Sequence, residues 1–445
     1  MQYYDNYFPD YPVEYYDIWN EPDHPYFWTG NYNQLLELFY RAYNVIKSYK
    51  PDAKVVGPSI SWFRPGESGV EGIVDFLVDL DEIYGIRLDA ISWHENGGTS
   101  YSTRPDGIPT RANYLRQQIQ NNFQDYSPEL HINEFMGKRV HLSPGWNVGF
   151  LYYIEKSQID RSMRTCWWIY STNPDDYWCD CWAGLNGLLM KDGETPQPAY
   201  WIWLRHAQME NEIKLDVSFS DVYTNVIATR NSSSNSIKLL TGRYMKTSPN
   251  DVIINIDDYS FSQNILVRIE KVPNDPNFYL DPPIAKPMPE GPELIFNEIV
   301  EIIDESIQIT IDDYIDGDVY IITIYPPPSK PIISGPSSGK PNTDYNYKFL
   351  SEDPSGSDIY YYIDWNDGNT EDWIGPFSSG EEITISHSWN KKGSYTIKSK
   401  VKDMYDLESD WGFLEITMPK YKIINLPLFY RLLELIKSSI LCLKL

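Results

Sequence analysis

Cysteine is scarce in this sequence, with four residues in 445. That number is too small for a disulfide scaffold. A single bridge among Cys166, Cys179 and Cys181 is compatible with their spacing, and so are free or buried thiols. The sequence has no C-x-x-C pair and no histidine cluster, so we expect neither a metal site nor a cofactor.

Basic residues are few relative to acidic ones. The 37 Lys and Arg are opposed by 63 Asp and Glu, which gives a formal net charge of −26. Because nucleic-acid binding depends on clustered positive charge, we exclude a nucleic-acid partner. The acidity also fits a soluble, exported protein.

Long apolar runs are absent, so we expect no membrane span. The first ten residues, MQYYDNYFPD, lack the basic and apolar regions of a signal peptide. Residues 420–445 carry apolar residues at helical spacing, interrupted by Arg431, Glu434 and Lys437. This segment is predicted to be an amphipathic tail that anchors or docks the chain.

Aromatic residues, in contrast, are abundant. They make up 15% of the chain and include 36 Tyr and 15 Trp. Aromatic faces are surfaces against which proteins stack sugar rings, which favours a carbohydrate ligand. Genome composition or β-rich surfaces would explain the same enrichment.

The first 212 residues alternate extended and helical runs, as βαβ units do. The first helical run, residues 32–50, puts its apolar residues on one stripe, which indicates an amphipathic helix. The extended runs are residues 13–21, 53–61, 88–97, 129–137 and 164–172. The other helical runs are residues 71–85, 111–126, 147–162 and 197–209. We therefore expect part of a parallel (β/α)8 barrel over residues 1–212.

The helical period disappears after residue 212. Residues 213–325 alternate polar and apolar residues between turn signals, which predicts an antiparallel β-sandwich. Residues 326–331, PPPSKP, are a stiff linker. Residues 332–419 form a third unit of short strands.

Two glutamates end extended runs. Glu21 follows the first run in "DIWNEP", and Glu134 ends the fourth in "LHINEF". Strand ends of a parallel barrel share one face, so the two carboxyl groups can meet there. Such a pair can hydrolyse a glycosidic bond, one as acid and the other as nucleophile. His94 and Trp168 also end extended runs, and each is equally compatible with a purely structural role.

The stretch "IWNEPDHPYFWTGNYNQLLELFYRAYNVIKSYKPDAKVVGPS" resembles the acid/base strand, helix and next strand of clan A glycoside hydrolases, most closely family 39, the β-xylosidase and α-L-iduronidase family. "DAISWHENG", "LHINEF" and "CWWIYST" continue the order as strands six, seven and eight. The resemblance implies Glu21 as acid/base and Glu134 as nucleophile. It further implies that Asn20 hydrogen-bonds the sugar 2-hydroxyl, that His94 is a contact beside the nucleophile, and that Trp168 is a platform for the sugar. We also expect Trp19 and Trp28 to bind substrate.

The third unit is similar to a PKD domain, an immunoglobulin-like sandwich of extracellular proteins. "DWNDGNT" stands where that family has W-G-D-G, and "HSWNKKGSYTIKSKVKD" matches a second stretch. The resemblance implies a spacer or interaction module in a secreted or cell-surface protein. Surface association through this unit or through the tail is expected.

A complete barrel needs eight strands, and the sequence begins about ten residues before the strand that resembles the fourth. We expect the chain to be the C-terminal portion of a longer polypeptide, with its signal peptide in the missing part. The partial sheet would then have two open edges and an uncovered apolar interior.

The sequence thus predicts a retaining O-glycosyl hydrolase that acts on polysaccharides or oligosaccharides. Xylan-type, glucan-type and uronic-acid-containing glycans all remain open. The alternative is a non-catalytic glycan-binding or adhesive protein of the cell surface.

Overall fold

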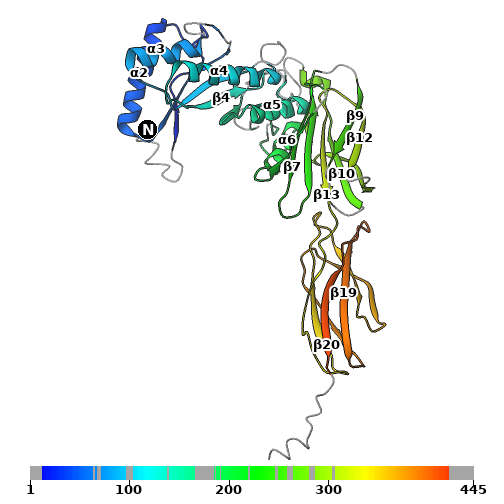
Figure 1. Cartoon of the computed structure of the whole chain (residues 1–445). Helices are drawn as coiled ribbons and strands as arrows, with labels where there is room; N and C mark the ends of the chain where they lie inside the picture. Colours follow the sequence, from blue (N-terminus) through cyan, green and yellow to red (C-terminus); the bar gives the residue numbers. More distant parts are fainter. Residues whose placement is uncertain are drawn as a thin grey trace, which may run out of the picture. The chain divides into compact units, whose positions relative to one another are not determined.

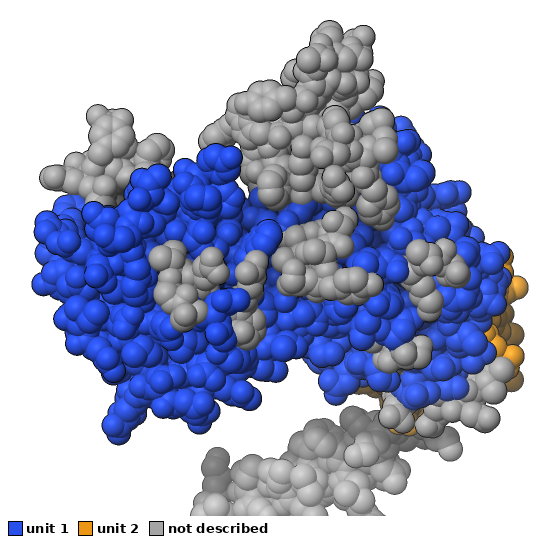
Figure 2. All heavy atoms as spheres, turned by 90° about the horizontal axis from the view of Figure 1, so that it is seen from above, with its two compact units in different colours: residues 1–257, 267–297, 306–324 blue, residues 258–266, 298–305, 325–445 orange. Residues whose placement is uncertain are grey.

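The computed structural model describes residues 13–63, 66–67, 72–96, 104–137, 140–165, 185, 187–190, 192–218, 221–245, 249–257, 264–279, 286–302 and 306–419. The predictions for Trp168, for the three cysteines at 166, 179 and 181, and for the tail at 420–445 lie outside these residues. The chain forms two compact units, which Figure 2 distinguishes by colour. The first comprises residues 1–257, 267–297 and 306–324, and the second comprises 258–266, 298–305 and 325–445.

The first unit begins with a five-stranded parallel sheet in the order β1-β2-β3-β4-β5. Its strands are β1 (Tyr15–Asp17), β2 (Lys54–Ile60), β3 (Ala90–Glu95), β4 (Glu129–Phe135) and β5 (Arg161–Arg164). The helices between them are α2 (Tyr32–Tyr49), α3 (Ile73–Tyr84), α4 (Ile108–Asn122) and α5 (Pro144–Lys156), with a short 3-10 turn, η3 (Pro105–Gly107), before α4 (Figure 1). This is the strand and helix alternation of a half-barrel, as the sequence predicted.

The first helix shows how the sequence sets these elements. The side chain of Asn31 accepts a hydrogen bond from the amide of Gln34, and the side chain of Gln34 accepts one from the amide of Asn31. This reciprocal cap satisfies two amides that a helix start otherwise leaves unpaired. The stripe that the helix buries includes Leu35 and Phe39, which join the core between the helices and the outer face of the sheet.

The parallel sheet is strongly curled. In a flat sheet β1 and β4 would lie about 14 Å apart, three strand spacings. The hydroxyl of Tyr15 on β1 nevertheless donates to Glu129 on β4 at 2.9 Å. Arg161 on β5 also donates to the Tyr15 hydroxyl, at 3.3 Å, so side chains of the two edge strands touch.

The inner face of the curl is largely polar, which corrects the apolar interior expected from the sequence. The strands alternate, so that residues such as Val55, Ile91 and Ile132 face the helices. The side chains between them on the inner face include Tyr15, Asp17, Lys54, Ser92, His94, Glu129, His131, Asn133 and Arg161. Hydrogen bonds among these groups hold the curl from inside.

Glu129 is the centre of the charged group at the N-terminal end of the strands. It accepts from Tyr15, forms an ion pair with Lys54, and lies 2.9 Å from Nε2 of His131. Burial opposes ionisation of this carboxyl, but the hydrogen bonds from Lys54, His131 and Tyr15 outweigh it and lower the pKa of Glu129 to about 2.

Antiparallel strands complete the first unit. A six-stranded sheet has the order β11-β10-β13-β8-β7-β6, and β12 pairs with β9 separately. The strands are β6 (Ile213–Lys214), β7 (Thr224–Arg230), β8 (Ile237–Arg243), β9 (Asn250–Ile256), β10 (Asn264–Val272), β11 (Glu293–Glu301), β12 (Ile307–Tyr314) and β13 (Val319–Tyr325), with a 3-10 turn, η4 (Pro276–Tyr279). We did not predict β11, whose Leu294 and Ile295 are both exposed.

Helix α5 packs against both sheets. Its Val148 and Leu151 share a core with Ile202 of α6 (Pro198–Ala207) and with Leu240 of β8. At its first turn the amide of Gly145 donates to the carbonyl of Gly317 at 2.8 Å. A Cβ on Gly145 would lie 1.9 Å from the carbonyl oxygen of Arg243, so only glycine fits there.

The second unit contains two antiparallel sheets, β14-β15-β18 and β17-β16-β19-β20. Their strands are β14 (Ile332–Ser334), β15 (Tyr345–Leu350), β16 (Ile359–Asp364), β17 (Thr370–Phe377), β18 (Ile383–His387), β19 (Gly393–Asp403) and β20 (Gly412–Met418). Trp365 and Trp389 are fully buried in the core of this unit. The predicted turn in "DWNDGNT" lies between β16 and β17, with Gly368 at a left-handed φ of 97°.

No helix among the residues that the structure describes is both long and apolar enough to cross a bilayer.

The Glu129 group predicts an acid-sensitive contribution to stability. Its folded-state pKa is lowered, so the stabilisation is present above the ordinary glutamate value of about 4.3 and is lost as the pH falls toward 2. Glu129→Gln should lower the melting temperature at pH 7 by about 2 to 4 °C, the shift given by about 1 kcal/mol. The difference from wild type should vanish near pH 2, and Glu14→Gln on an exposed side chain serves as control. A constant difference at all pH values would contradict this account.

Candidate active site

Glu21 lies in the loop that follows β1. Its amide donates to the carbonyl of Ser59 at 2.9 Å, and its own carbonyl accepts from the amide of His24 at 3.0 Å. Its φ is +48°, a left-handed conformation that residues other than glycine rarely adopt and that costs on the order of 1–3 kcal/mol. The loop therefore holds Glu21 in a specific, strained orientation.

Glu134 reaches the same end of the sheet from β4. A register shift between Trp93 and His94 places His94 of β3 directly opposite Glu134. The side-chain amide of Asn96 donates to Glu134 Oε2 at 2.8 Å, and the hydroxyl of Thr165 donates to Asn96 Oδ1 at 2.5 Å. Glu134 thus has one oriented oxygen, and its side chain remains about one-third exposed.

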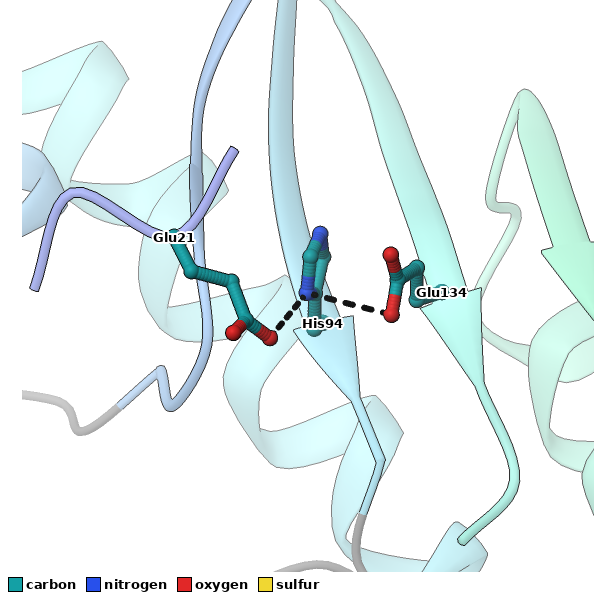
Figure 3. Close-up of side chains that lie close together, drawn as sticks. All are labelled: Glu21, His94 and Glu134. Atoms are coloured by element: carbon teal, nitrogen blue, oxygen red, sulfur yellow. Dashed lines mark hydrogen bonds and ion pairs between the residues drawn. The ribbon is translucent and has the colours of Figure 1, made fainter. Parts of the chain in front are cut away.

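His94 lies between the two carboxyl groups (Figure 3). Its Nδ1 is 2.9 Å from Oε1 of Glu21 and 3.7 Å from Oε2 of Glu134. One oxygen of each carboxyl group and this nitrogen all lie within 4.8 Å of one another. A neutral imidazole can donate a hydrogen bond from Nδ1–H to a carboxylate or, in its other tautomer, accept one at Nδ1 from a carboxylic acid, so this contact can serve either form of Glu21.

The same spacing gives the trio a second chemical capacity. Glu21, His94 and Glu134 are close enough to hold a metal ion. Two carboxylates and one imidazole are ligands that several divalent metals accept. Our expectation of no metal site remains a prediction.

Two of the predicted sugar-binding residues, Trp19 and Asn20, directly precede Glu21 in the chain. Trp19 and Asn20 line a hollow of about 400 Å³ together with Asp17, Ile18 and Phe27. Trp19 is 38% exposed, and its indole N–H donates to the carbonyl of Phe27. Trp28 meets Trp19 edge to face at 5.5 Å and packs partly against the core, so it supports Trp19 from behind.

A polar network lies on the inner face next to the trio, and sequence reasoning missed it. Oδ2 of Asp17 accepts hydrogen bonds from the hydroxyl of Ser59 and the side-chain amide of Asn133, both at 2.5 Å. Ser92 lies 2.7 Å from the Ser59 hydroxyl. We call Asp17, Ser59, Ser92 and Asn133 the Asp17 network. Period-two alternation puts Asp17, Ser92 and Asn133 on the inner face, but it would put Ser59 on the face of Val55. A register shift between Pro58 and Ile60, with Ser59 at a φ of +54°, brings Ser59 into the network, and no motif marks this shift.

The Asp17 network ties together the two strands that carry the glutamates. Asp17 precedes Glu21 by four residues, and Asn133 adjoins Glu134. The hydrogen bond between Asp17 and Asn133 therefore sets how far apart β1 and β4 lie at this level of the curl. Asp17 is exposed at the edge of the sheet, yet desolvation by the surrounding side chains raises the pKa of its carboxyl despite the hydrogen bonds and the nearby His94, which act in the opposite direction.

No family model matches the chain, and a search of curated proteins found no match. Among solved structures the chain is similar to N2152 from Neocallimastix frontalis, with 20% identity, a TM-score of 0.55 and 70% of each chain covered. A likeness at this identity shows a shared fold.

Two further solved structures are similar to parts of the chain. A glucosidase from Croceicoccus marinus has 15% identity and a TM-score of 0.49, with 70% of this chain and 69% of that chain covered. The PKD domain of an M14-like peptidase from a Thermoplasmatales archaeon has 54% identity and a TM-score of 0.21, with 21% of this chain and 97% of that domain covered.

The raised pKa of Asp17 leads to a prediction of opposite sign to that for Glu129. The folded-state pKa of Asp17 is raised, so protonated Asp17 stabilises the fold below the ordinary aspartate pKa of about 3.9. This stabilisation is lost as the pH rises through the higher pKa of the folded state. Asp17→Asn, which stays neutral, should melt at a higher temperature than wild type at pH 7 and at the same temperature at pH 3. If Asp17→Asn instead melted at a lower temperature than wild type at pH 7, the hydrogen bonds to the charged carboxylate would outweigh the cost of its desolvation.

Proposed function

We propose that the parallel half-barrel carries the catalytic centre of a retaining glycosidase. The observation that supports this is the pair of strand-end carboxyl groups whose nearest oxygens lie within 4.8 Å, on either side of His94. Retaining glycosidases hold their two carboxyl groups about 5 to 5.5 Å apart, whereas inverting enzymes leave about 6.5 to 9.5 Å for a water molecule. The short spacing favours retention.

In this proposal Glu134 is the nucleophile. The hydrogen bond from Asn96 fixes one carboxylate oxygen, and the partly exposed side chain can reach a sugar above the strand ends. An oxygen of Glu134 attacks the anomeric carbon as the bond to the leaving oxygen breaks. The product of this step is a glycosyl ester on Glu134.

Glu21 is the acid and then the base. It gives its proton to the leaving oxygen in the first step, and in the second step it takes a proton from the water that attacks the ester. This second attack restores the configuration of the anomeric carbon. His94, 2.9 Å from Glu21, holds the carboxyl group in position through both protonation states.

Trp19 and Phe27 are proposed to contact the sugar. Both are exposed, both line the hollow beside Asn20, and aromatic faces suit the apolar faces of sugar rings. Asn20 lies between Trp19 and Glu21 in the chain and also lines the hollow, and it is proposed to hydrogen-bond a sugar hydroxyl. Trp28 and Trp168 remain predicted contacts of the sugar.

The decisive experiment separates the two carboxyl roles. Glu134→Ala should reduce turnover by about 10³-fold or more, and added azide should restore it by forming a glycosyl azide of inverted configuration. Glu21→Gln should lose most activity on unactivated glycosides and much less on substrates whose leaving group needs no proton. Nuclear magnetic resonance should show retained configuration in the wild-type product.

Controls distinguish the competing functions. Glu82→Gln, on an exposed position of α3, should behave as wild type. Activity that a chelator abolishes and a divalent metal restores would instead support a metal centre at the trio. Equal polysaccharide binding by wild type and Glu134→Ala, with no turnover by either, would favour the non-catalytic glycan-binding protein.

We further propose that residues 332–419 are a PKD-like module and that the protein acts outside the cell or at its surface. The support is the match of "DWNDGNT" and its turn, together with the 54% identity to a PKD domain. Protease added to intact cells should cleave the protein. Cleavage only after lysis would contradict an external location.

A further inference from the structure

Asp23 joins the loop after β1 to the loop after β2, and no step of the proposed reaction uses it. Its Oδ1 accepts a hydrogen bond from the amide of Ser61 at 2.8 Å. Its Oδ2 accepts from the hydroxyl of Ser61 at 2.7 Å and from the amide of Trp62 at 3.3 Å. Both carboxylate oxygens are therefore engaged by the first two residues that follow β2.

These contacts adjoin two residues with left-handed backbones. Glu21 has a φ of +48° and Ser59 a φ of +54°, angles that residues other than glycine rarely adopt. The two are joined directly, because the amide of Glu21 donates to the carbonyl of Ser59 at 2.9 Å. Asp23 lies two residues beyond Glu21 and binds Ser61, two residues beyond Ser59. The two strained residues therefore lie within one closed ring of backbone and hydrogen bonds.

The loop after β1 also has hydrogen bonds of its own. The amide of His24 donates to the carbonyl of Glu21 at 3.0 Å, and the amide of Trp28 donates to the carbonyl of His24 at 3.1 Å. Bonds of this kind set the shape of the loop but not its place on the sheet. Its place depends on contacts with β2 and the residues after it, and Asp23 makes three of them.

The place of the loop decides where the carboxyl group of Glu21 lies. Oε1 of Glu21 is 2.9 Å from Nδ1 of His94, and a strained backbone such as that of Glu21 persists only where surrounding contacts hold it. A catalytic group that is misplaced by about 1 Å can cost about 100-fold in rate. Contacts that fix the Glu21 backbone thus bear directly on proton transfer.

We propose that Asp23 is a positioning residue that holds Glu21 in its strained conformation beside His94. The inference rests on the proposed glycosidase function, in which Glu21 is the acid and then the base. Asp23 acts through Glu21 and does not touch the sugar. Without its hydrogen bonds the backbone at Glu21 relaxes, and the carboxyl group leaves the position from which it protonates the leaving oxygen.

The test compares substrates whose leaving groups differ in their need for a proton. Asp23→Ala should lower kcat/KM by about 100-fold on unactivated glycosides and by much less where the leaving group needs no proton. Asp23→Asn keeps an oxygen for the amide of Ser61 and should retain most of the activity. Asp52→Asn, at an exposed position before β2, serves as control. An equal loss on both classes of substrate would overturn the proposal, because it would show a general loss of structure.

A second measurement does not depend on activity. Amide hydrogen exchange at Glu21 and Ser61 should be at least about tenfold faster in Asp23→Ala than in wild type, whereas exchange at Phe39 in α2 should not change. Unchanged exchange at Glu21 would refute the positioning role whatever the activity. If wild type hydrolysed no glycoside and exchange at Glu21 still became faster, the proposed function would fail while Asp23 would still hold Glu21.

Discussion

The hydrogen bonds that cross the inner face of the parallel sheet, from β1 to β4, are the constraint on which the rest of the first unit depends. A sheet of five strands can be nearly flat, and then residues on β1 and β4 are too far apart to cooperate. Tyr15 and Asp17 reach Glu129 and Asn133, so the sheet must curl. Curling brings the strand ends together, and Glu21 and Glu134 meet only because of it.

Because the inner face of the curled sheet is polar, it can be exposed to water at little cost. An apolar interior would need further side chains to fill it, whereas hydroxyl, amide and charged groups can bond to one another or to solvent. The two short hydrogen bonds from Ser59 and Asn133 offset only part of the cost of desolvating the Asp17 carboxylate. Polar contacts thus join β1 to β4 at two levels, Tyr15 with Glu129 and Asp17 with Asn133.

The sequence predicted those features that depend on local patterning. The amphipathic stripe of α2, the succession of strands and helices, and the carboxyl groups after β1 and within β4 follow from periodicity and from the NEP motif. Local patterning could not show that His94 lies directly opposite Glu134, because that position requires a register shift between β3 and β4; only the family resemblance placed His94 beside Glu134. Nor could it predict the Asp17 network or β11, since the former depends on curvature and the latter exposes its apolar residues.

The contact between Gly145 and the loop at Gly317 has a consequence for protein engineering. The first turn of α5 approaches the antiparallel sheet so closely that backbone meets backbone, without side chains between them. A foreign domain that presents side chains in place of this backbone could not make the same contact with α5. Chimaeras that exchange the half-barrel should therefore carry residues 213–325 with it, and those that exchange only one of the two would leave α5 without its counterpart.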